Sequence, residues 1–445
     1  MKFSSLGLSS DLLRAIEKCG YTDMTPIQAQ AITPARRGND ILANAQTGTG
    51  KTAAFALPIL QQMIDKPATS ESKNPRALIL TPTRELAEQL AETIGAYAQF
   101  LPFNITSLYG GVKLGGQAAK LRAGIDILIS TPGRLLEHMT LCNVDLASVE
   151  YVVLDEADRM LDMGFISDVQ NLLGHTNKKR QTLLFSATIS PSVNELAHKL
   201  LNRHTEIRVD KLNITADTVE HAMYPVEERR KIELFLELLD EQNWFQVLVF
   251  TSTKHQADKL MAGLKQRKIE AAVCHADKSQ GSRRRALVDF KSGKLQVLIA
   301  TEVAARGLDI QGLEYVVNYN LPYLPEDYVH RIGRTGRAGK SGHAISFISR
   351  EEERMVDRIQ RLIGTPIKRI VRRGFEVSNR DTLLKNISQT SRPQYANKAT
   401  ATKIERHKST NTKSETNKSS TKKTSNVKSS SGRSNNKAAR PKSSR

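Results

Sequence analysis

Cysteines and long apolar runs are scarce in this chain of 445 residues, and each shortage argues against a class of protein. The three cysteines, Cys19, Cys142 and Cys274, are too few and too far apart for a disulfide framework or a CxxC metal site. The longest apolar stretches, such as residues 53–60, are far shorter than the roughly 20 residues that span a bilayer. Residues 1–11 lack the apolar core of a signal peptide. The sequence therefore predicts neither a secreted, disulfide-stabilised protein nor a membrane-spanning one, and it favours a reducing compartment.

Acidic residues are few relative to basic ones, and most of the positive excess lies near the end of the chain. The sequence has 66 Lys+Arg and 46 Asp+Glu, a net charge of +20, which favours a polyanionic partner. Residues 373–445 contribute +14 of this charge, from 18 basic and 4 acidic residues. From residue 391 onward, serine and basic residues dominate and large apolar residues are rare. Because such a segment cannot bury enough apolar surface to offset its conformational entropy, we predict that residues 373–445 form a disordered basic tail.

Short apolar runs alternate with amphipathic stretches through the rest of the chain, which is typical of buried parallel strands between helices. They fall into two sets with the same alternation of strands and helices. The first set is 77–81, 126–130, 151–154 and 182–185, and the second is 247–250, 271–274, 297–300, 315–318 and 343–348. We therefore predict an α/β fold with two domains in tandem, residues 1–208 and 218–372. Because ligands bind at the carboxyl ends of strands in open α/β sheets, the informative residues should follow the strands.

A glycine-rich segment after the apolar residues 41–42 has the pattern of a phosphate-binding loop. Gly48 and Gly50 would let backbone amides turn towards phosphates at a helix N-terminus. Lys51 would reach the β- and γ-phosphates, and the Thr52 hydroxyl would ligate Mg²⁺. The alternative is a glycine-rich turn without a ligand, which the GKT ending after a strand disfavours. The predicted loop consists of Ala45, Gln46, Thr47, Gly48, Thr49, Gly50, Lys51 and Thr52.

Two adjacent carboxylates follow the predicted strand 151–154. Asp155, at the end of this strand and beside a phosphate loop, would hold Mg²⁺ through its waters. Glu156 would orient and deprotonate an attacking water. Taken alone, the acidic residues 155–158 could be a solvated turn, but the phosphate loop earlier in the chain favours the catalytic interpretation.

A third motif, residues 330–337, places arginines three apart with intervening glycines. Arg334 and Arg337 could stabilise charge on a transferring γ-phosphoryl group, as arginine fingers do. The alternatives are a basic surface loop or a second stretch that contacts RNA. Catalysis would then depend on Lys51, Asp155, Glu156, Arg334 and Arg337.

Together these motifs resemble those of the DEAD-box ATP-dependent RNA helicases of superfamily 2. The literal Asp-Glu-Ala-Asp tetrad, the phosphate loop and His-Arg-Ile-Gly-Arg-Thr-Gly-Arg occur in the family's order, within a resemblance that covers about residues 1–370. The sequence of residues 3–21 is most similar to that of the bacterial RhlE-type subgroup. Further matching segments are 20–28 (the Q motif, within residues 1–29), 82–87, 110–111, 131–134, 186–188, 280–283, 301–309 and 316–322.

The resemblance implies two RecA-like domains, ATP and Mg²⁺ as cofactors, and a role for several nucleotide-binding residues. Gln28 would read the adenine edge and Tyr21 would stack on the base, although Tyr21 could instead anchor the N-terminal helix. Asp309 would contact the ribose, and the backbone of Gly307 would approach the γ-phosphate. These residues together would favour ATP over other nucleotides.

The same resemblance implies sequence-independent RNA contacts, mostly to phosphates and 2′-hydroxyls. Ser186 and Thr188 would link the acidic tetrad to the RNA-binding residues, although strand-end capping is an alternative role for both. Asp158 and His330 would take part in the same coupling. The expected RNA-binding residues are Pro82, Thr83, Arg84, Gly110, Gly111, Thr131, Arg134, Gln280, Arg283 and Thr301.

Two positions depart from the commonest wording of the family. Glu302 stands where Asp is frequent, which keeps the charge on a longer arm. Asn320 also stands where Asp is frequent, which removes a charge. We expect activity to survive both changes and leave their effect on coupling between ATP and RNA open.

The function expected from the resemblance is RNA-dependent ATP hydrolysis that separates short RNA duplexes in a bacterial cytoplasm, with no membrane partner. ATP and RNA would each favour a closed arrangement of the two domains, which is reciprocal coupling between two sites. The basic tail would hold RNA loosely and with strong salt dependence, unless it only aids solubility. Two rival functions are a DNA translocase of the same superfamily and an RNA chaperone whose tail anneals strands without ATP.

Overall fold

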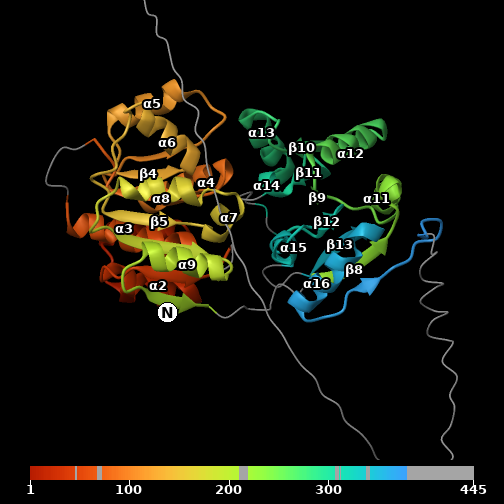
Figure 1. Ribbon diagram of the computed structural model, residues 1–445, viewed down its shortest axis with the longest axis horizontal. Coiled ribbons are helices and arrows are strands. Elements are labelled where there is room, and N and C mark those ends of the chain that lie inside the picture. Colours follow the sequence, from red (N-terminus) through yellow and green to blue (C-terminus); the bar gives the residue numbers. More distant parts are fainter. Residues whose placement is uncertain are drawn as a thin grey trace, which may run out of the picture. The chain divides into compact units, whose positions relative to one another are not determined.

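The computed structural model describes residues 1–45, 48–67, 73–209, 219–305, 310, 312–336 and 341–377, and every structural statement below concerns these residues. They form two seven-stranded parallel sheets, each flanked by helices (Figure 1). The α/β prediction with two RecA-like sheets is therefore confirmed. Residues 378–445 of the predicted tail lie outside the described residues, whereas residues 373–377 are described and Phe375 is buried in the core of the second sheet, which corrects the predicted start of the tail.

The first sheet has the strand order β3-β4-β2-β5-β6-β1-β7. Its strands are β1 (Ile41–Asn44), β2 (Ala77–Leu80), β3 (Ile105–Leu108), β4 (Ile127–Ser130), β5 (Tyr151–Leu154), β6 (Gln181–Ser186) and β7 (Thr205–Arg208). Its helices are η1 (Phe3–Leu6), α1 (Ser10–Lys18), α2 (Pro26–Arg36), α3 (Lys51–Asp65), α4 (Arg84–Tyr97), α5 (Leu114–Ala123), α6 (Pro132–Thr140), α7 (Ala157–Asp162), α8 (Ile166–Gly174) and α9 (Pro191–Leu200).

Helices cover both faces of this sheet, which explains why strands such as β2 and β5 are apolar on both faces. Val153 of β5 packs in a core with α1–α4, whereas its neighbour Val152 packs on the other face with α6–α9. Successive side chains of a strand point to opposite faces, so each face of a doubly covered strand must be apolar. The buried residues of β2, β4 and β5 satisfy this requirement.

The second sheet has the strand order β10-β11-β9-β12-β13-β8-β14. Its strands are β8 (Val219–Pro225), β9 (Val247–Thr251), β10 (Ala271–Cys274), β11 (Val297–Thr301), β12 (Tyr315–Asn318), β13 (Gly342–Ile348) and β14 (Lys368–Arg369). Its helices are η2 (Glu228–Arg230), α11 (Lys231–Glu241), α12 (Lys254–Gln266), α13 (Gln280–Lys291), α14 (Glu302–Ala305), α15 (Pro325–Ile332), η3 (Arg350–Glu352) and α16 (Glu353–Ile363). No described helix has the length and apolar character needed to cross a bilayer.

The parallel arrangement gathers four strand ends of the first sheet at one edge. The backbone amide of Ala45, after β1, donates to the carbonyl of Ser186 at the end of β6, at 2.9 Å. The amide of Asp155, after β5, donates to the carbonyl of Leu80 at the end of β2, at 3.0 Å. The predicted phosphate loop and the acidic tetrad therefore begin at the same edge, as the sequence predicts.

Candidate active site

The predicted phosphate loop leads directly into α3. Gly48 and Gly50 have φ angles of 84° and 92°, a region that side chains other than glycine rarely adopt. Gly50 precedes Lys51, the first residue of α3, so the free amides of this helix N-terminus begin here. Gln46 and Thr47 lie outside the described residues. This loop suits an anion, because an N-terminus presents unpaired amides and the positive end of the helix dipole.

Lys51 is the principal cation beside this loop. Its side chain is only 6% exposed, and its Nζ lies 3.4 Å from Asp155 Oδ1. Burial opposes the charged ammonium, but Asp155, Glu156 and Asp158 outweigh it and raise the pKa of Lys51. The Nζ makes no hydrogen bond to any described residue. A buried, charged ammonium with unused donors fits the phosphates of ATP.

Glu156 turns the chain sharply between β5 and α7. Its φ is 56°, in the left-handed region, and it occupies the N-cap position of α7. Such a conformation is costly for a residue other than glycine and is typical of functional sites. Burial, followed by the negative charges of Asp155 and Asp158, raises the pKa of Glu156. A carboxylate with a raised pKa is a better proton acceptor, which suits the predicted general base.

The last member of the acidic tetrad holds the segment after β6. Asp158 Oδ2 accepts hydrogen bonds from both the amide and the hydroxyl of Thr188, each at 3.0 Å. Ser186 Oγ donates to the carbonyl of Thr188 at 2.7 Å. The predicted coupling residues Asp158, Ser186 and Thr188 are therefore brought together, although 30 residues separate the first from the last.

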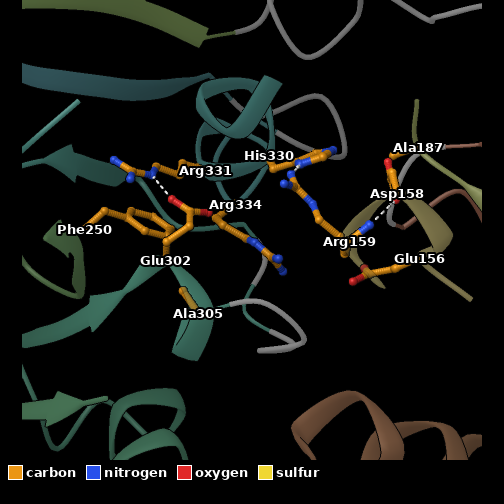
Figure 2. Close-up of a pocket in the computed structure, with 10 residues that line it drawn as sticks. All are labelled: Glu156, Asp158, Arg159, Ala187, Phe250, Glu302, Ala305, His330, Arg331 and Arg334. Atoms are coloured by element: carbon orange, nitrogen blue, oxygen red, sulfur yellow. Dashed lines mark hydrogen bonds and ion pairs between the residues drawn. The ribbon is translucent and has the colours of Figure 1, made fainter. Parts of the chain in front are cut away.

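One pocket combines this acidic segment with arginines of the other sheet (Figure 2). Glu156 and Asp158 line it from one side, and His330 and Arg334 line it from the other. Arg337 lies outside the described residues, as do Gly307 and Asp309. The pocket thus joins the predicted general base to one of the two predicted arginine fingers.

Arg159 also lines this pocket, and sequence reasoning missed it. It is ion-paired to Asp327 and contacts His330 Nδ1, and it lies 3.1 Å from Asp162. Burial opposes its charge, but Asp327 outweighs this and raises the pKa of Arg159. The only available signal was its place directly after the acidic tetrad. Arg159 therefore connects the tetrad to the predicted coupling residue His330.

Arg331 is buried beside this pocket and is held by Glu302. Its Nε donates to Glu302 Oε2 at 2.6 Å, and its Nη1 donates to Asn318 Oδ1 at 3.0 Å and to the Asn320 carbonyl at 2.7 Å. The guanidinium also lies over the ring of Phe250, at 5.0 Å from its centroid. Glu302, which stands where Asp is frequent in the family, therefore neutralises a buried arginine. Asn320, the second departure, accepts from the Ser252 amide at 3.2 Å.

Replacing Glu302 with glutamine is expected to lower the free energy of unfolding by about 2–4 kcal/mol, because it leaves a buried guanidinium without its counter-charge. Arg331 is only 2% exposed, so water cannot compensate for the loss. Urea unfolding of the full chain measures the effect. Glu302→Asp keeps the charge on a shorter arm and should cost less. Equal stability of Glu302→Gln and the unsubstituted chain would contradict the prediction.

Gln28 connects the N-terminal segment to the phosphate loop. Its Oε1 accepts from the Thr25 amide at 2.9 Å, which completes a capping box on α2. Its Nε2 donates to the Gly50 carbonyl at 3.1 Å. Tyr21 lies nearby in sequence, with its hydroxyl 3.2 Å from that of Tyr97 and its ring 6.4 Å from Phe3. The adenine contacts predicted for Gln28 and Tyr21 stay predictions.

Replacing Gln28 with alanine is expected to lower the free energy of unfolding by about 1–2 kcal/mol and to weaken ATP binding about tenfold. The side chain is 4% exposed and supports both a helix cap and the phosphate loop. Gln256→Ala is the matched control, because Gln256 forms the same capping box with Thr253 on α12. Only Gln28→Ala should change nucleotide affinity, as measured by calorimetry. An equal loss of affinity in both variants would refute the link to the phosphate loop.

The predicted RNA-binding residues of the first sheet gather where β2, β3 and β4 end. The Arg84 guanidinium packs against Gly110 and Gly111 so closely that a Cβ at Gly111 would collide with it. Arg134 donates to the carbonyl of Val112 at 3.1 Å. Thr131 precedes the first residue of α6, and its amide donates to the Leu108 carbonyl at 3.1 Å. Pro82 and Thr83 directly precede α4.

The predicted RNA-binding residues of the second sheet include two on α13. Arg283 Nη2 lies 2.8 Å from Glu85 Oε1, and Gln280 Nε2 donates to the same oxygen at 3.1 Å. Glu85 was missed by sequence reasoning, although it directly follows Arg84. Thr301, the third of these residues, ends β11.

The side chains at the phosphate loop fit a Mg²⁺ ion that is shared with phosphate and water. Among the described residues, no three His, Cys, Asp or Glu side chains converge as a metal-binding group. Asp155 and Thr52 stay the predicted protein ligands, with phosphate oxygens and water as the others. This pattern is usual for Mg²⁺, which keeps several waters and binds through one or two carboxylates plus substrate phosphates.

Comparison with known proteins gives a consistent result along the chain. Residues 25–196 match the family described as DEAD/DEAH box helicase, and residues 230–339 match the helicase conserved C-terminal domain. The DEAD-box ATP-dependent RNA helicase CshA of Bacillus subtilis is 41% identical over 358 residues, which cover 80% of this chain and 72% of that protein. The CshA of Geobacillus kaustophilus is 37% identical over 413 residues, which cover 92% and 87% of the two chains.

A solved structure supports the same relationship. S. cerevisiae Dbp5 bound to RNA and ADP BeF3 is 29% identical, with a TM-score of 0.74, and the match covers 88% of this chain and all of that one. The CshA matches extend over most of the chain, and the motifs lie in the same order along it. The chain therefore belongs to the family of DEAD-box ATP-dependent RNA helicases and is an ATPase.

Proposed function

We propose that this protein couples RNA-stimulated ATP hydrolysis to the local, non-processive unwinding of short RNA duplexes and to the remodelling of ribonucleoprotein complexes. The observation that carries the proposal is the pocket in Figure 2, which joins Glu156 and Asp158 to His330 and Arg334. The residues predicted for hydrolysis and for RNA coupling thus line one pocket. Ribosome assembly and RNA decay are both compatible settings.

The chemistry follows from the side chains around the phosphate loop. Lys51 would hold the β- and γ-phosphates, while Asp155 and Thr52 would hold Mg²⁺, which neutralises phosphate charge when bound. Glu156 would take a proton from the attacking water. Arg334 and Arg337 would balance the charge that develops on the transferring phosphoryl group.

The contacts of Asp158 support a route between hydrolysis and RNA binding. Asp158 holds Thr188 through two hydrogen bonds, and the adjacent Arg159 contacts His330. A change at Glu156 would therefore be transmitted to segments on both sheets. RNA would lie along Arg84, Gly111 and Arg134, with contacts mainly to phosphates and 2′-hydroxyls.

Several finer assignments belong to the same proposal. The division into domains 1–208 and 218–372 is supported by the two separate sheets, whereas the tail 373–445 stays a prediction. The RhlE-type subgroup stays a prediction, because the relatives described above bear the name CshA. A bacterial cytoplasm and an RNA-holding tail are likewise proposals, the first supported by the bacterial origin of these relatives.

The proposal predicts that ATP turnover depends on RNA. The rate of phosphate release by the full chain should rise when RNA is added and should rise much less with DNA of the same sequence. Strand separation of a short RNA duplex should require ATP. Equal ATPase rates with and without RNA would refute the coupling, and equal stimulation by DNA would favour a DNA translocase.

A further inference from the structure

Helix α16 and strand β14 lie at the edge of the second sheet that is farthest from the predicted RNA-binding residues of α13. α13 packs on β10 and β11, whereas β14 is the last strand at the opposite edge. Six strand spacings of roughly 4.8 Å separate these edges by about 30 Å. Figure 1 shows α13 beside β10 and α16 beside β13 and β8.

The two helices nevertheless cover the same face of this sheet. Val316 of β12 packs in the core below α13, and Ala344 of β13 packs in the core below α16. These two residues are paired in adjacent strands, so their side chains point to the same face. A ligand that extends along this face can therefore reach from α13 to α16.

The exposed side of α16 has a row of arginines. Arg354, Arg358 and Arg361 are all exposed, whereas Val356 and Ile359 are buried in the core. Residues at positions i, i+4 and i+7 form one row along a helix. This row points away from the buried side of the helix, and three guanidinium groups follow one another along it.

No carboxylate of the described residues forms an ion pair with this row, although the exposed Asp357 lies between Arg354 and Arg361 in the helix. Among the described residues, none forms an ion pair with Arg354, Arg358 or Arg361, and Arg361 Nε donates only to the backbone carbonyl of Asp357, at 3.1 Å. Like charges at these spacings destabilise a helix. The adjacent Glu353 is instead paired with Arg369 of β14. A partner that supplies negative charge would relieve the repulsion along the row.

β14 extends the positive surface beside the helix. Arg369 is paired with Glu353 at 2.7 Å, and the Ile367 amide donates to Gln360 Oε1 at 2.9 Å, so the strand runs close to α16. Lys368 of β14 is also exposed. After β14 the described chain passes to the core on the other face of the sheet, where Phe375 packs with α11, and residues 378–445 carry a net charge of +14 in the sequence, from 17 basic and 3 acidic residues. The surface and the tail that follows it thus have the same sign of charge.

An exposed aromatic ring lies near the start of the arginine row. Tyr323 is 78% exposed. Two residues before it, the Leu321 amide donates at 2.8 Å to Glu352, which directly precedes α16. Two residues of chain reach at most about 7 Å, so Tyr323 lies close to the first turn of α16. Aromatic rings beside cations are typical of surfaces that bind single-stranded nucleic acid by stacking and charge.

We propose that α16, β14 and Tyr323 form a second RNA-binding surface, which holds single-stranded RNA that flanks the duplex being unwound. The proposal rests on the RNA helicase function proposed above. The arginine row would contact successive phosphates, and Tyr323 would stack on a base, so binding would be independent of sequence. RNA that reaches from α13 to this surface needs roughly ten nucleotides, at about 3 Å for each stacked nucleotide.

The test compares the affinity of the full chain for a short blunt RNA duplex and for the same duplex with a single-stranded extension. Fluorescence anisotropy across a salt series measures both. The extension should tighten binding to the unsubstituted chain. In the variant R354Q/R358Q/R361Q, the increase in affinity that the extension causes should be about tenfold smaller. The slope of log affinity against log salt should decrease in magnitude by about 2. Tyr323→Ala should reduce the gain with little change in slope.

The matched control is K178Q/K179Q/K265Q, which removes three positive charges from exposed positions outside this surface. The control should keep the gain from the extension. All substituted residues are exposed, so the urea midpoint should not fall in any variant. The proposal is overturned if the single-stranded extension increases RNA affinity by the same factor in the triple arginine variant and in the control.

Two further outcomes keep the proposals separate. If no RNA stimulates ATP turnover by the unsubstituted chain, the proposed helicase function fails. If the blunt duplex stimulates turnover but the extension adds no affinity, only the second surface is overturned. Binding to vesicles of anionic lipid that requires the arginine row, with RNA affinity unchanged in the variant, would assign this surface to a membrane and overturn the RNA assignment.

Discussion

Replacing Glu156 with glutamine is expected to lower RNA-stimulated ATP hydrolysis by about 10²–10⁴-fold, because the amide cannot accept a proton from the attacking water. The side chain keeps its size, and glutamine can occupy the same left-handed position as glutamate. ATP affinity should therefore stay within about threefold, since ground-state binding does not require the proton acceptor. Single-turnover phosphate release measures the hydrolytic step, and calorimetry measures ATP binding.

The burial of Glu156 makes this prediction sharper. The carboxylate is 8% exposed, and burial is the main reason that its pKa is raised. A neutral amide at this position avoids the desolvation cost of a charge, so the urea midpoint should not fall. Glu195→Gln makes the same chemical change at an exposed residue that pairs with Lys199, and it should leave turnover unchanged. Turnover that survives in Glu156→Gln would refute the assigned role.

Replacing Arg334 with lysine is expected to lower RNA-stimulated turnover by about 10³-fold. Lysine keeps the charge but loses the planar donor fork that matches phosphate oxygens. Arg334 lines the same pocket as Glu156, but it lies on the segment after α15 rather than on the phosphate loop. The loss should therefore appear in the RNA-stimulated rate more than in ATP affinity. Rapid-quench measurements with saturating RNA test the rate.

Two other arginines serve as controls for this prediction. Arg229→Lys changes an exposed residue paired with Glu227 and should have no effect on turnover. Arg331→Lys should instead lower the urea midpoint, because Arg331 uses its fork to bind Glu302, Asn318 and Asn320. A wild-type rate in Arg334→Lys, or an equal loss of stability in Arg334→Lys and Arg331→Lys, would contradict the assignment of Arg334.

The central strands could be predicted from the sequence because helices cover both of their faces. Runs such as residues 151–154 and 247–250 must be apolar on both sides, and this leaves a clear pattern. β3, β7 and β8 were not predicted, since each mixes polar residues with apolar ones. β14 has only two residues, both exposed, and exists because it pairs with β8. For these strands the neighbouring strand, rather than local composition, decides the structure.

The candidate site residues could likewise be picked out from the sequence, because they occur in short local motifs. The phosphate loop and the residues at 155–156 each follow a strand, so their place at the edge of the sheet follows from the fold class. Sequence order could not give the partners of Arg159, Glu85 or Glu302. Those partners lie far away in the chain, as in the pair of Arg283 with Glu85.

The sequence by itself therefore determined the two-sheet α/β class, the place of the glycine-rich loop before α3 and the segregation of positive charge into the last part of the chain. Each of these depends on local pattern or composition. Only the tertiary structure decided that Glu156 adopts a left-handed conformation, that Glu302 neutralises the buried Arg331, and that, among the described residues, no carboxylate forms an ion pair with the arginine row of α16. These features depend on which surfaces meet after folding, because burial and the distance between charges set their energies.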